Sequence, residues 1–383
     1  MDFQYTEEQL DIKKNVRSFV EKEIAPRVTE YNRTEKFPWD IVKKMGDLGY
    51  LGGVVPAEYG GSELDYLTYV MIVEEISRVC PIMGSVSAYP SSMAGQGLLG
   101  WGTEEQKRKY LPPLTAGEAL AAGAITEPGY GSDAAGLKAS AKRVDGGYIL
   151  NGAKTWISNA TVGKWIMVFA TVDPSLRHRG ITAFIVEQGT PGMITRPIHG
   201  KLGNRPYDTG EIFFEDCFVP DENRLGNEGD GWKILSASVE TSRIHVAARS
   251  TGIIWGCLEA SVKYAQERSA FGKTIGQFQF IQAMITDMAL NLENARNLVY
   301  KAAWMKENKH PDTFKHVSMA KLFASQAAVK SASDAIQIHG AYGISDEYPV
   351  EKFYREAKVQ EIVEGTSEIH KMIIAKSELG FRK

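Results

Sequence analysis

The sequence predicts an α+β fold of three units: an N-terminal α-helical bundle, a middle antiparallel β-barrel or sandwich, and a C-terminal α-helical bundle. Two observations lead to this prediction. Apolar residues recur at the 3, 4 spacing of amphipathic helices in the first and last thirds of the chain. Between them lie short β-branched and aromatic runs separated by Gly or Pro. The chain of 383 residues exceeds one average domain, and the predicted units span residues 1–117, 118–226 and 227–383.

The N-terminal unit begins with a helix-start signal. Thr6-Glu7-Glu8-Gln9 is a capping box, in which the hydroxyl and the amide satisfy free backbone NH groups. Further along, Tyr69, Ile72, Val73 and Ile76 form the buried stripe of another helix. Tyr89-Pro90 then predicts a helix break, because proline cannot continue a helix.

The middle unit changes to the patterns of strands. Residues 148–150 and 154–157 flank Asn151-Gly152, which predicts a hairpin turn at that dipeptide. Residues 165–172, 181–186 and 212–214 continue the strands. From about residue 231 helices return, with a buried stripe at Ile281, Ile285, Met288, Leu292, Ala295 and Val299.

Composition excludes several classes of partner. The formal net charge is -3 and no run of five or more Lys or Arg occurs, which argues against nucleic acid and acidic membrane surfaces. The three cysteines, Cys80, Cys217 and Cys257, are far apart and have no metal-binding spacing, so we expect no metal site. No stretch approaches about 18 consecutive apolar residues, and Met1 leads directly into helical sequence without a targeting segment. We therefore expect a cytoplasmic, bacterial protein.

Three segments contain candidate chemistry. Residues 125–133 place two glycines among hydroxyl side chains, which lets backbone NH groups approach an anion or a flat heterocycle. This segment lacks the Lys of a Walker loop, and the chain has no GxGxxG before a helix, so a Rossmann-type nicotinamide site is unsupported. Residues 154–159 place Trp156 among hydroxyls. Taken alone, the first segment fits an ordinary loop and the tryptophan fits a core side chain.

The third segment, residues 361–369, contains Glu364. This carboxylate follows two apolar residues and precedes Gly365, so it can enter a partly dry cleft, where desolvation would raise its pKa and suit a general base. Without further context, a solvated glutamate near a helix cap formed by Thr366 or Ser367 is the simpler explanation of the segment.

Several motifs in order resemble the acyl-CoA dehydrogenases over essentially the whole chain. They include the opening Thr6–Leu10, the segments 124–133 and 337–343, and the segment 347–352, which is Glu-Tyr-Pro-Val-Glu-Lys. The closing Glu364-Gly365-Thr366-Ser367-Glu368-Ile369 completes the series. The resemblance extends to short- and branched-chain members, with a cyclic acyl-CoA dehydrogenase as one possibility.

The resemblance implies an FAD-dependent oxidoreductase that forms a 2-enoyl-CoA. Glu364 would remove the proton alpha to the thioester carbonyl while hydride moves from the beta carbon to flavin N5. The thioester carbonyl would accept hydrogen bonds from the Glu364 backbone NH and the ribityl chain. The implied cofactor-binding residues are Ile125, Thr126, Trp156, Ser158, Arg268, Phe271, Gln279, Gln337, Gly340, Ala341, Thr366 and Glu368. The implied substrate-binding residues are Ser132, Glu240, Thr241, Ser242, Arg243 and Gly365.

The same resemblance implies that part of the dinucleotide site comes from a neighbouring subunit, that the protein is a homotetramer, and that an electron-transferring flavoprotein accepts the electrons. Some members place their base immediately before the arginine of the helix that contains Arg243, but that residue is Ser242 here. Val363 stands where many straight-chain enzymes have Tyr, which predicts a wider acyl pocket. Residues 84–97 contain no Arg or Lys for a distal carboxylate, so we expect a short, branched or alicyclic acyl group such as cyclohexanecarboxyl-CoA.

Two other hypotheses remain open at this stage. The first is an acyl-CoA oxidase or a flavin monooxygenase on the same scaffold. The second is a non-catalytic CoA-binding scaffold protein that retains the fold.

Overall fold

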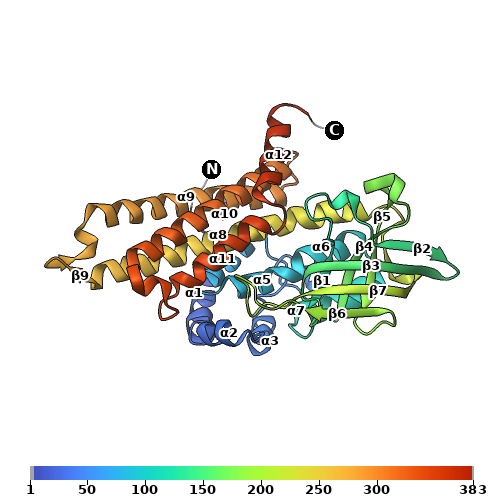
Figure 1. Cartoon of the computed structure of the whole chain (residues 1–383), viewed down its shortest axis with the longest axis horizontal. Helices are drawn as coiled ribbons and strands as arrows, with labels where there is room; N and C mark the ends of the chain where they lie inside the picture. The colour runs from blue at the N-terminus through green and yellow to red at the C-terminus, as the bar shows by residue number, and fades with distance from the viewer. Residues whose placement is uncertain (1–3, 382–383) are drawn as a thin grey trace.

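The computed structural model describes residues 4–381 and contains helical N- and C-terminal parts with a sheet between them in sequence. Figure 1 shows the sheet at one end of an elongated molecule and the long C-terminal helices extending to the other end. This confirms the predicted fold class. The proposed divisions after residues 117 and 226 fall in connecting segments, between Thr115 and Ala121 and between Leu225 and Gly231.

The N-terminal part consists of short helices. They are α1 (Glu7–Phe19), α2 (Val28–Thr34), α3 (Trp39–Asp47), α4 (Tyr66–Ser77), α5 (Pro81–Ala88), α6 (Met93–Trp101) and α7 (Glu104–Thr115). The capping box forms as predicted, because the Gln9 backbone NH donates to Thr6 Oγ1 over 3.2 Å and the Thr6 NH to Gln9 Oε1 over 3.1 Å. Helix α5 ends at Ala88, so the break at Tyr89-Pro90 is confirmed.

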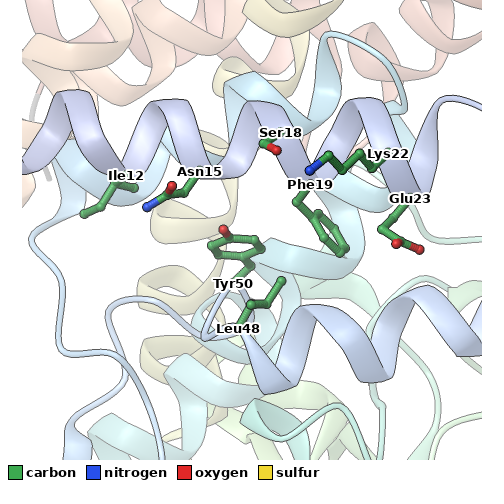
Figure 2. Close-up of a pocket in the computed structure, with 8 residues that line it drawn as sticks. All are labelled: Ile12, Asn15, Ser18, Phe19, Lys22, Glu23, Leu48 and Tyr50. Carbon is green, nitrogen blue, oxygen red and sulfur yellow. The ribbon is translucent and has the colours of Figure 1, made fainter.

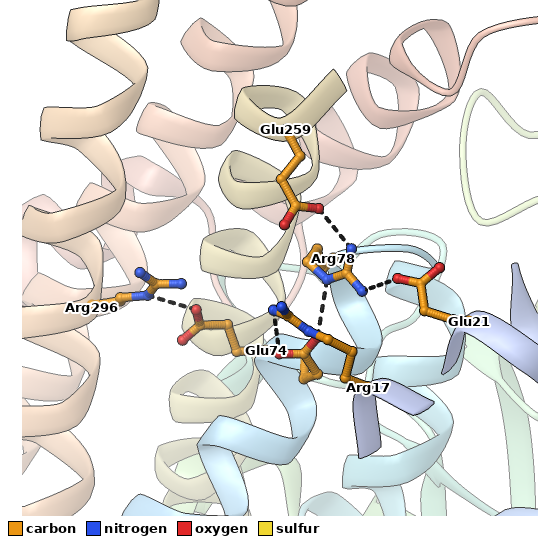
Figure 3. A network of polar contacts seen from close by, with 7 residues as sticks. Arg17, Glu21, Glu74, Arg78, Glu259 and Arg296 are labelled. Carbon is orange, nitrogen blue, oxygen red and sulfur yellow. Dashed lines mark hydrogen bonds and ion pairs between the residues drawn. The ribbon is translucent and has the colours of Figure 1, made fainter. Parts of the chain in front are cut away.

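A partly buried ion network joins this part to the C-terminal helices (Figure 3). Arg78 at the end of α4 donates to Glu21, to Glu75 over 3.0 Å and to Glu259 over 2.6 Å. Arg296 donates to Glu74 over 2.7 Å. Because these charges belong to segments far apart in the sequence, they fix how the two helical parts pack together, although their desolvation offsets much of the Coulomb energy.

The middle part is one sheet that bends into two halves. Its strands are β1 (Ala121–Ala124), β2 (Ser140–Val144), β3 (Gly147–Ser158), β4 (Trp165–Thr171), β5 (Ile181–Glu187), β6 (Met193–Pro197), β7 (Thr209–Pro220) and β8 (Arg224–Leu225). The order is β6-β7-β3-β2-β4-β5-β8, and β1 pairs with β4. A single residue pair, Ser140 with Thr171, joins the halves. Most pairings are antiparallel as predicted, but β1 and β2 each pair with β4 in parallel.

The hairpin turn predicted at Asn151-Gly152 is wrong. These residues lie inside β3, and the turn between β2 and β3 occurs at residues 145 and 146. Asn151 instead exchanges hydrogen bonds of 3.0 and 2.9 Å with Asp216 on β7. Gly152 has a φ of 139° and lies where the register of β3 against β7 is irregular. A Cβ atom at Gly152 would lie only 2.7 Å from the Cα atom of Ala139. The dipeptide therefore forms a β-bulge within β3 and allows close contact with the neighbouring segment, instead of forming a turn.

The C-terminal part contains the longest helices, α8 (Gly231–Glu267), α9 (Gln279–Glu307), α10 (Thr313–His339), α11 (Val350–Ile362) and α12 (Ser367–Glu378). The predicted stripe on α9 is confirmed: its last four residues are buried and its first two pack against the same core. A small hairpin of β9 (Ser269–Ala270) and β10 (Lys273–Thr274) connects α8 to α9. Within residues 4–381, no helix combines the length and the apolar character needed to cross a bilayer.

Candidate active site

A cavity of about 630 Å³ lies where the sheet meets the C-terminal helices. Its walls come from α5 and α6, the segment after β1, the end of β3, one face of α8, and the loop between α11 and α12. The α8 face consists of Trp232, Leu235, Val239, Ser242, His245 and Arg249, which recur at the 3, 4 spacing of a helix. Segments from all three parts of the chain therefore meet at this one site.

Glu364 lies on the cavity wall in the short loop between α11 and α12. Its backbone is left-handed, with a φ of 57°, and Gly365 follows at 98°. A non-glycine residue in this region is uncommon and must be held by its surroundings. Arg243 Nε donates to the Glu364 carbonyl over 2.9 Å, and Lys321 Nζ to the Gly365 carbonyl over 2.7 Å and the Glu361 carbonyl over 3.2 Å. Two buried cations thus fix the loop that presents the carboxylate.

Burial raises the pKa of the Glu364 carboxyl group, as the sequence predicted. A hydrogen bond from Ser242 and the positive charges of Arg243, Arg249 and Lys321 act in the opposite direction and favour the carboxylate. Burial also lowers the pKa of Lys321 to about 7. The site therefore holds a desolvated carboxyl group that stays within reach of its ionised form, which is the property of a general base.

Trp156 also lines the cavity. Its backbone also lies in the left-handed region, with a φ of 60°, where the register of β3 against β7 shifts. As a result the indole is 61% exposed and lines the cavity, although most strand tryptophans are buried. Thr126 and Ser158 line the same wall, and the Thr155 NH donates to the Thr126 carbonyl over 2.9 Å. An accessible aromatic face beside hydroxyls and backbone amides fits a flat heterocycle with polar edges.

A buried ion pair holds the segment after β1 in place. Lys154 Nζ donates to Glu127 Oε1 over 2.8 Å and to the Ile125 carbonyl over 3.0 Å. The Glu127 carboxylate also accepts from the backbone NH groups of Lys138 and Ala139, over 2.6 and 2.9 Å. Burial lowers the pKa of Lys154 to about 8, while Glu127 acts to raise it. The pair joins the 125–133 and 154–159 segments that the sequence singled out.

Ten of the predicted site residues line this one cavity. They are Ile125, Thr126, Ser132, Trp156, Ser158, Ser242, Arg243, Glu364, Gly365 and Thr366. Three others lie nearby in sequence but not on its wall. Glu240 pairs with Lys306 over 2.6 Å, Thr241 is buried with its hydroxyl directed at the Ala237 carbonyl, and Glu368 is exposed beside Thr366.

The remaining predicted residues, Arg268, Phe271, Gln279, Gln337, Gly340 and Ala341, gather at the far end of the molecule. Arg268 caps the end of α8, where Tyr264 stacks on His339 of α10 at 4.3 Å between ring centroids. Figure 1 shows this end, marked by β9, opposite the end that holds the sheet. Within one chain these residues cannot reach a group bound against Trp156.

The sequence reasoning missed two buried cations of the site. Lys321 is the charged residue of an otherwise apolar run in α10, and Arg249 lines the cavity from α8. Arg249 follows Ser242 by seven residues, so the helical period that places Ser242 on the wall also predicts Arg249 there.

A second hollow of about 560 Å³ lies between α1 and the segment after α3 (Figure 2). It shares no lining residue with the cavity that contains Glu364. Among residues 4–381 no group of three or more His, Cys, Asp or Glu could hold a metal ion, and all three cysteines are free and buried. The chemistry of the molecule therefore concentrates around Glu364.

Comparison with known proteins agrees with this geometry. Three family models match the chain: acyl-CoA dehydrogenase N-terminal domain over residues 6–118, middle domain over 122–217, and C-terminal domain over 229–379. An acyl-CoA dehydrogenase of Bacillus subtilis is 44% identical over 375 residues, covering 98% of this chain and 99% of the relative. The mouse mitochondrial short-chain specific acyl-CoA dehydrogenase is 42% identical over 364 residues, covering 95% of this chain and 88% of the relative.

A solved glutaryl-CoA dehydrogenase in complex with glutaryl-CoA superposes with a TM-score of 0.96 at 40% identity, covering 100% of this chain and 98% of the other. With the arrangement of Glu364 and Trp156 around one cavity, these matches show that the chain belongs to the acyl-CoA dehydrogenase family, whose members are FAD-dependent oxidoreductases acting on acyl-CoA.

Proposed function

We propose that this protein removes hydrogen from the alpha and beta carbons of a short acyl-CoA thioester and releases the 2-enoyl-CoA. The observation that supports this most directly is the desolvated carboxyl group of Glu364 on the wall of the cavity that also exposes Trp156. Proton removal next to a carbonyl needs a base whose pKa approaches the working pH, and burial supplies that.

In this proposal Glu364 is the base, and its loop also orients the substrate. The thioester carbonyl would accept a hydrogen bond from the Glu364 backbone NH, which stabilises the negative charge that develops as the alpha proton leaves. Arg243 and Lys321 hold the neighbouring carbonyls, so neither the NH nor the carboxylate has to reorganise during the reaction. Ser242 cannot act as a base and serves as a hydrogen-bond partner of Glu364.

The residues around Trp156 fit FAD. Ile125, Thr126, Trp156 and Ser158 would contact the isoalloxazine ring, and Thr366 with Glu368 would meet the cofactor from the C-terminal side. When bound, FAD supplies the acceptor for the hydride from the beta carbon. Ser132, at the rim of the same cavity, is proposed to contact the pantetheine arm of the substrate, and Gly365 its acyl end.

The far-end residues are proposed to complete the cofactor site of a neighbouring subunit in a homotetramer. Phe271 is 96% exposed at the tip between β9 and β10, and Phe280 in the first turn of α9 is also exposed. Exposed aromatic side chains of this size favour an interface. Arg268 offers a fork of donors for a pyrophosphate, and Gln279, Gln337, Gly340 and Ala341 would contact the rest of the dinucleotide.

For the acyl group we propose a short chain with room for branching. Val363 lines the cavity beside Glu364, and its small side chain leaves space that an aromatic residue would fill. Cyclohexanecarboxyl-CoA is the alicyclic candidate. For the electrons we propose an electron-transferring flavoprotein as the acceptor.

A panel of CoA thioesters tests the proposal. Straight, branched, cyclic and dicarboxylic thioesters are mixed anaerobically with the FAD-loaded protein, and loss of the visible flavin absorbance is followed. We expect short thioesters to bleach the flavin. Absence of bleaching by every thioester would refute the proposed reaction, and rapid hydrogen peroxide formation in air, without transfer to a flavoprotein, would identify an oxidase instead.

A further inference from the structure

One part of the cavity wall has a chemistry that dehydrogenation of a hydrocarbon chain does not require. Arg249 of α8 lines the cavity beside Ser85, Ala88 and Tyr89 of the α5 segment, and it is only 9% exposed. Its Nη1 donates to the Ser85 hydroxyl. Gly84 makes room for its stem, since a Cβ at that position would lie 3.3 Å from Arg249 Cγ and 2.0 Å from Ser77 Oγ.

This guanidinium has no acidic partner. Among residues 4–381 no carboxylate forms a salt bridge with Arg249, and its Nε has no hydrogen-bond partner. Neighbouring His245 on the same face of α8 also has both ring nitrogens unpaired, and burial keeps it neutral by lowering its pKa to about 3. Arg243, the other buried arginine on this wall, also has an unpaired Nη1, but its Nε donates to the Glu364 carbonyl over 2.9 Å. Arg78, which lies outside the cavity, is by contrast surrounded by Glu21, Glu75 and Glu259. An unpaired buried cation is costly, so its retention calls for an anion that is not part of the chain.

The charges around Glu364 are unbalanced. Three buried cations, Arg243, Arg249 and Lys321, act on the single carboxylate of Glu364. Arg243 and Lys321 already donate hydrogen bonds to the carbonyls of Glu364 and Gly365. Buried Glu356 attracts Arg249 only from beyond salt-bridge distance and accepts from the Asn204 NH over 2.8 Å. Arg243 is held by the Glu364 carbonyl through Nε, whereas the only hydrogen bond of Arg249 among the described residues goes to the Ser85 hydroxyl, so Arg249 is the cation that is freest to meet a bound ligand.

The position of Arg249 suits the distal end of a short acyl group. Ser242, which contacts Glu364, and Arg249 are seven residues apart on α8, or about 10 Å along its axis. Helical side chains tilt toward the N-terminus, so the long Arg249 side chain reaches back toward Glu364 and shortens that separation. A ligand that presents its alpha carbon to Glu364 can therefore place a carboxylate two to three carbons further on beside the guanidinium.

We propose that Arg249 and Ser85 form a carboxylate subsite and that the preferred substrate is the CoA thioester of a short dicarboxylic acid. This inference rests on the proposed dehydrogenation, and it replaces the apolar branched or alicyclic acyl group considered above with one that ends in a carboxylate. Arg249 provides a planar fork of donors that matches a carboxylate. Ser85 positions this fork, because its hydroxyl accepts from Arg249 Nη1 and donates to the Pro81 carbonyl over 3.3 Å. The absence of a cation in residues 84–97, which argued against such a substrate, is compensated by an arginine from a different helix.

The test compares a carboxylate with its neutral isostere at the same chain length. Glutaryl-CoA and 4-carbamoylbutyryl-CoA differ only in the terminal group, and succinyl-CoA with 3-carbamoylpropionyl-CoA forms a second pair. Binding is measured by calorimetry in FAD-loaded Glu364→Gln protein, in which turnover does not consume the ligand. We expect the carboxylate of one pair to bind about 10- to 100-fold more tightly than its amide, the range for a hydrogen-bonded charge.

Variants assign that preference to the subsite. Arg249→Met keeps an apolar stem and should abolish the preference of carboxylate over amide, whereas Arg249→Lys should retain part of it. Ser85→Ala is a milder change that should reduce the preference by about 3- to 10-fold. Ser87→Ala on the same helix is the matched control, because the Ser87 hydroxyl bonds the Tyr50 carbonyl and does not line the cavity.

Equal affinity for carboxylate and amide in both pairs, in protein with unchanged Arg249, would overturn the proposal even if every variant misfolded. So would an undiminished preference in Arg249→Met, because Arg249 would then act only on the charge of Glu364. A failure of the proposed dehydrogenation is distinguishable, since it would leave the flavin unbleached by all thioesters while the binding preference persists.

Discussion

Replacing Lys321 with methionine should have two separate effects. It should change the pH dependence of the free energy of unfolding, and it should lower kcat, because Lys321 holds the loop that contains Glu364. Lys321 is fully buried, and burial lowers the pKa of its ammonium group from 10.5 to about 7. Because the folded-state pKa lies below the unfolded-state value, the unfolded chain binds more protons between pH 7 and 10.5. The free energy of unfolding therefore rises with pH across this window.

These two pKa values determine the size of the effect. Between pH 7 and 9, Lys321 should increase the free energy of unfolding by about 2 kcal/mol. Lys321→Met removes this contribution, so its stability should rise less steeply with pH by that amount. The variant also loses both donors to the carbonyls of Glu361 and Gly365, and kcat should fall by about 10- to 100-fold as Glu364 is displaced.

Urea unfolding at both pH values, followed by tryptophan fluorescence and circular dichroism, measures the difference. The matched control is Lys330→Met on the same helix, since the Lys330 side chain is exposed and pairs with Asp334 at the surface. Parallel stability-pH curves for the parent protein and Lys321→Met would refute the assigned burial. Unchanged kcat would refute the role of Lys321 in holding the loop.

Three further predictions concern the two walls of the cavity. Burial raises the pKa of Glu364, and only its carboxylate form can accept a proton, so kcat/KM should fall on acidification with a midpoint above pH 4.5. A pH-rate profile with a midpoint at or below pH 4.5 would contradict the burial of Glu364. Trp156→Ala should weaken FAD binding by about 3- to 10-fold in a fluorescence titration, and unchanged affinity would remove the indole from the cofactor site. Lys154→Met leaves the Glu127 carboxylate buried without its cation and should lower the free energy of unfolding by about 3–5 kcal/mol. The double variant Lys154→Met with Glu127→Gln should recover part of this loss. If denaturation shows that the effects of the two substitutions simply add, the two residues are not a coupled pair.

Periodicity predicted the helices well because burial of one face is a local property of sequence. The stripes beginning at Tyr69 and at Ile281 pack where the 3, 4 spacing places them. The capping box at Thr6 is equally local, since its two hydrogen bonds join residues three apart. Such features need no knowledge of the rest of the fold.

The hairpin position failed because two turn-forming dipeptides compete within a few residues. Both Asp145-Gly146 and Asn151-Gly152 have suitable chemistry, and local propensity cannot choose between them. The choice depends on distant partners, because Asn151 bonds to Asp216 and Gly152 packs against Ala139. The parallel pairing of β1 with β4 is nonlocal in the same sense.

The candidate site also has some features that the local sequence predicts and others that depend on distant residues. The Glu364 and Trp156 segments could be found from motifs, but their left-handed backbones could not, because residues far away hold these conformations. Lys321 and Arg249 lie on α10 and α8 outside the motif segments of those helices. Buried charges of this kind become visible only when packing brings their partners, or the lack of partners, into view.

Glu364→Gln tests the central claim most directly. The FAD-loaded variant is mixed anaerobically with the most active thioester of the panel, and the affinity for the thioester and the rate of flavin bleaching are measured in the same experiment. The account predicts binding within a few-fold of the parent protein, because the side chain keeps its size, and bleaching slower by at least about 10²- to 10⁴-fold, because the base is gone. Bleaching at the parent rate would contradict the assignment of Glu364 as the group that removes the alpha proton.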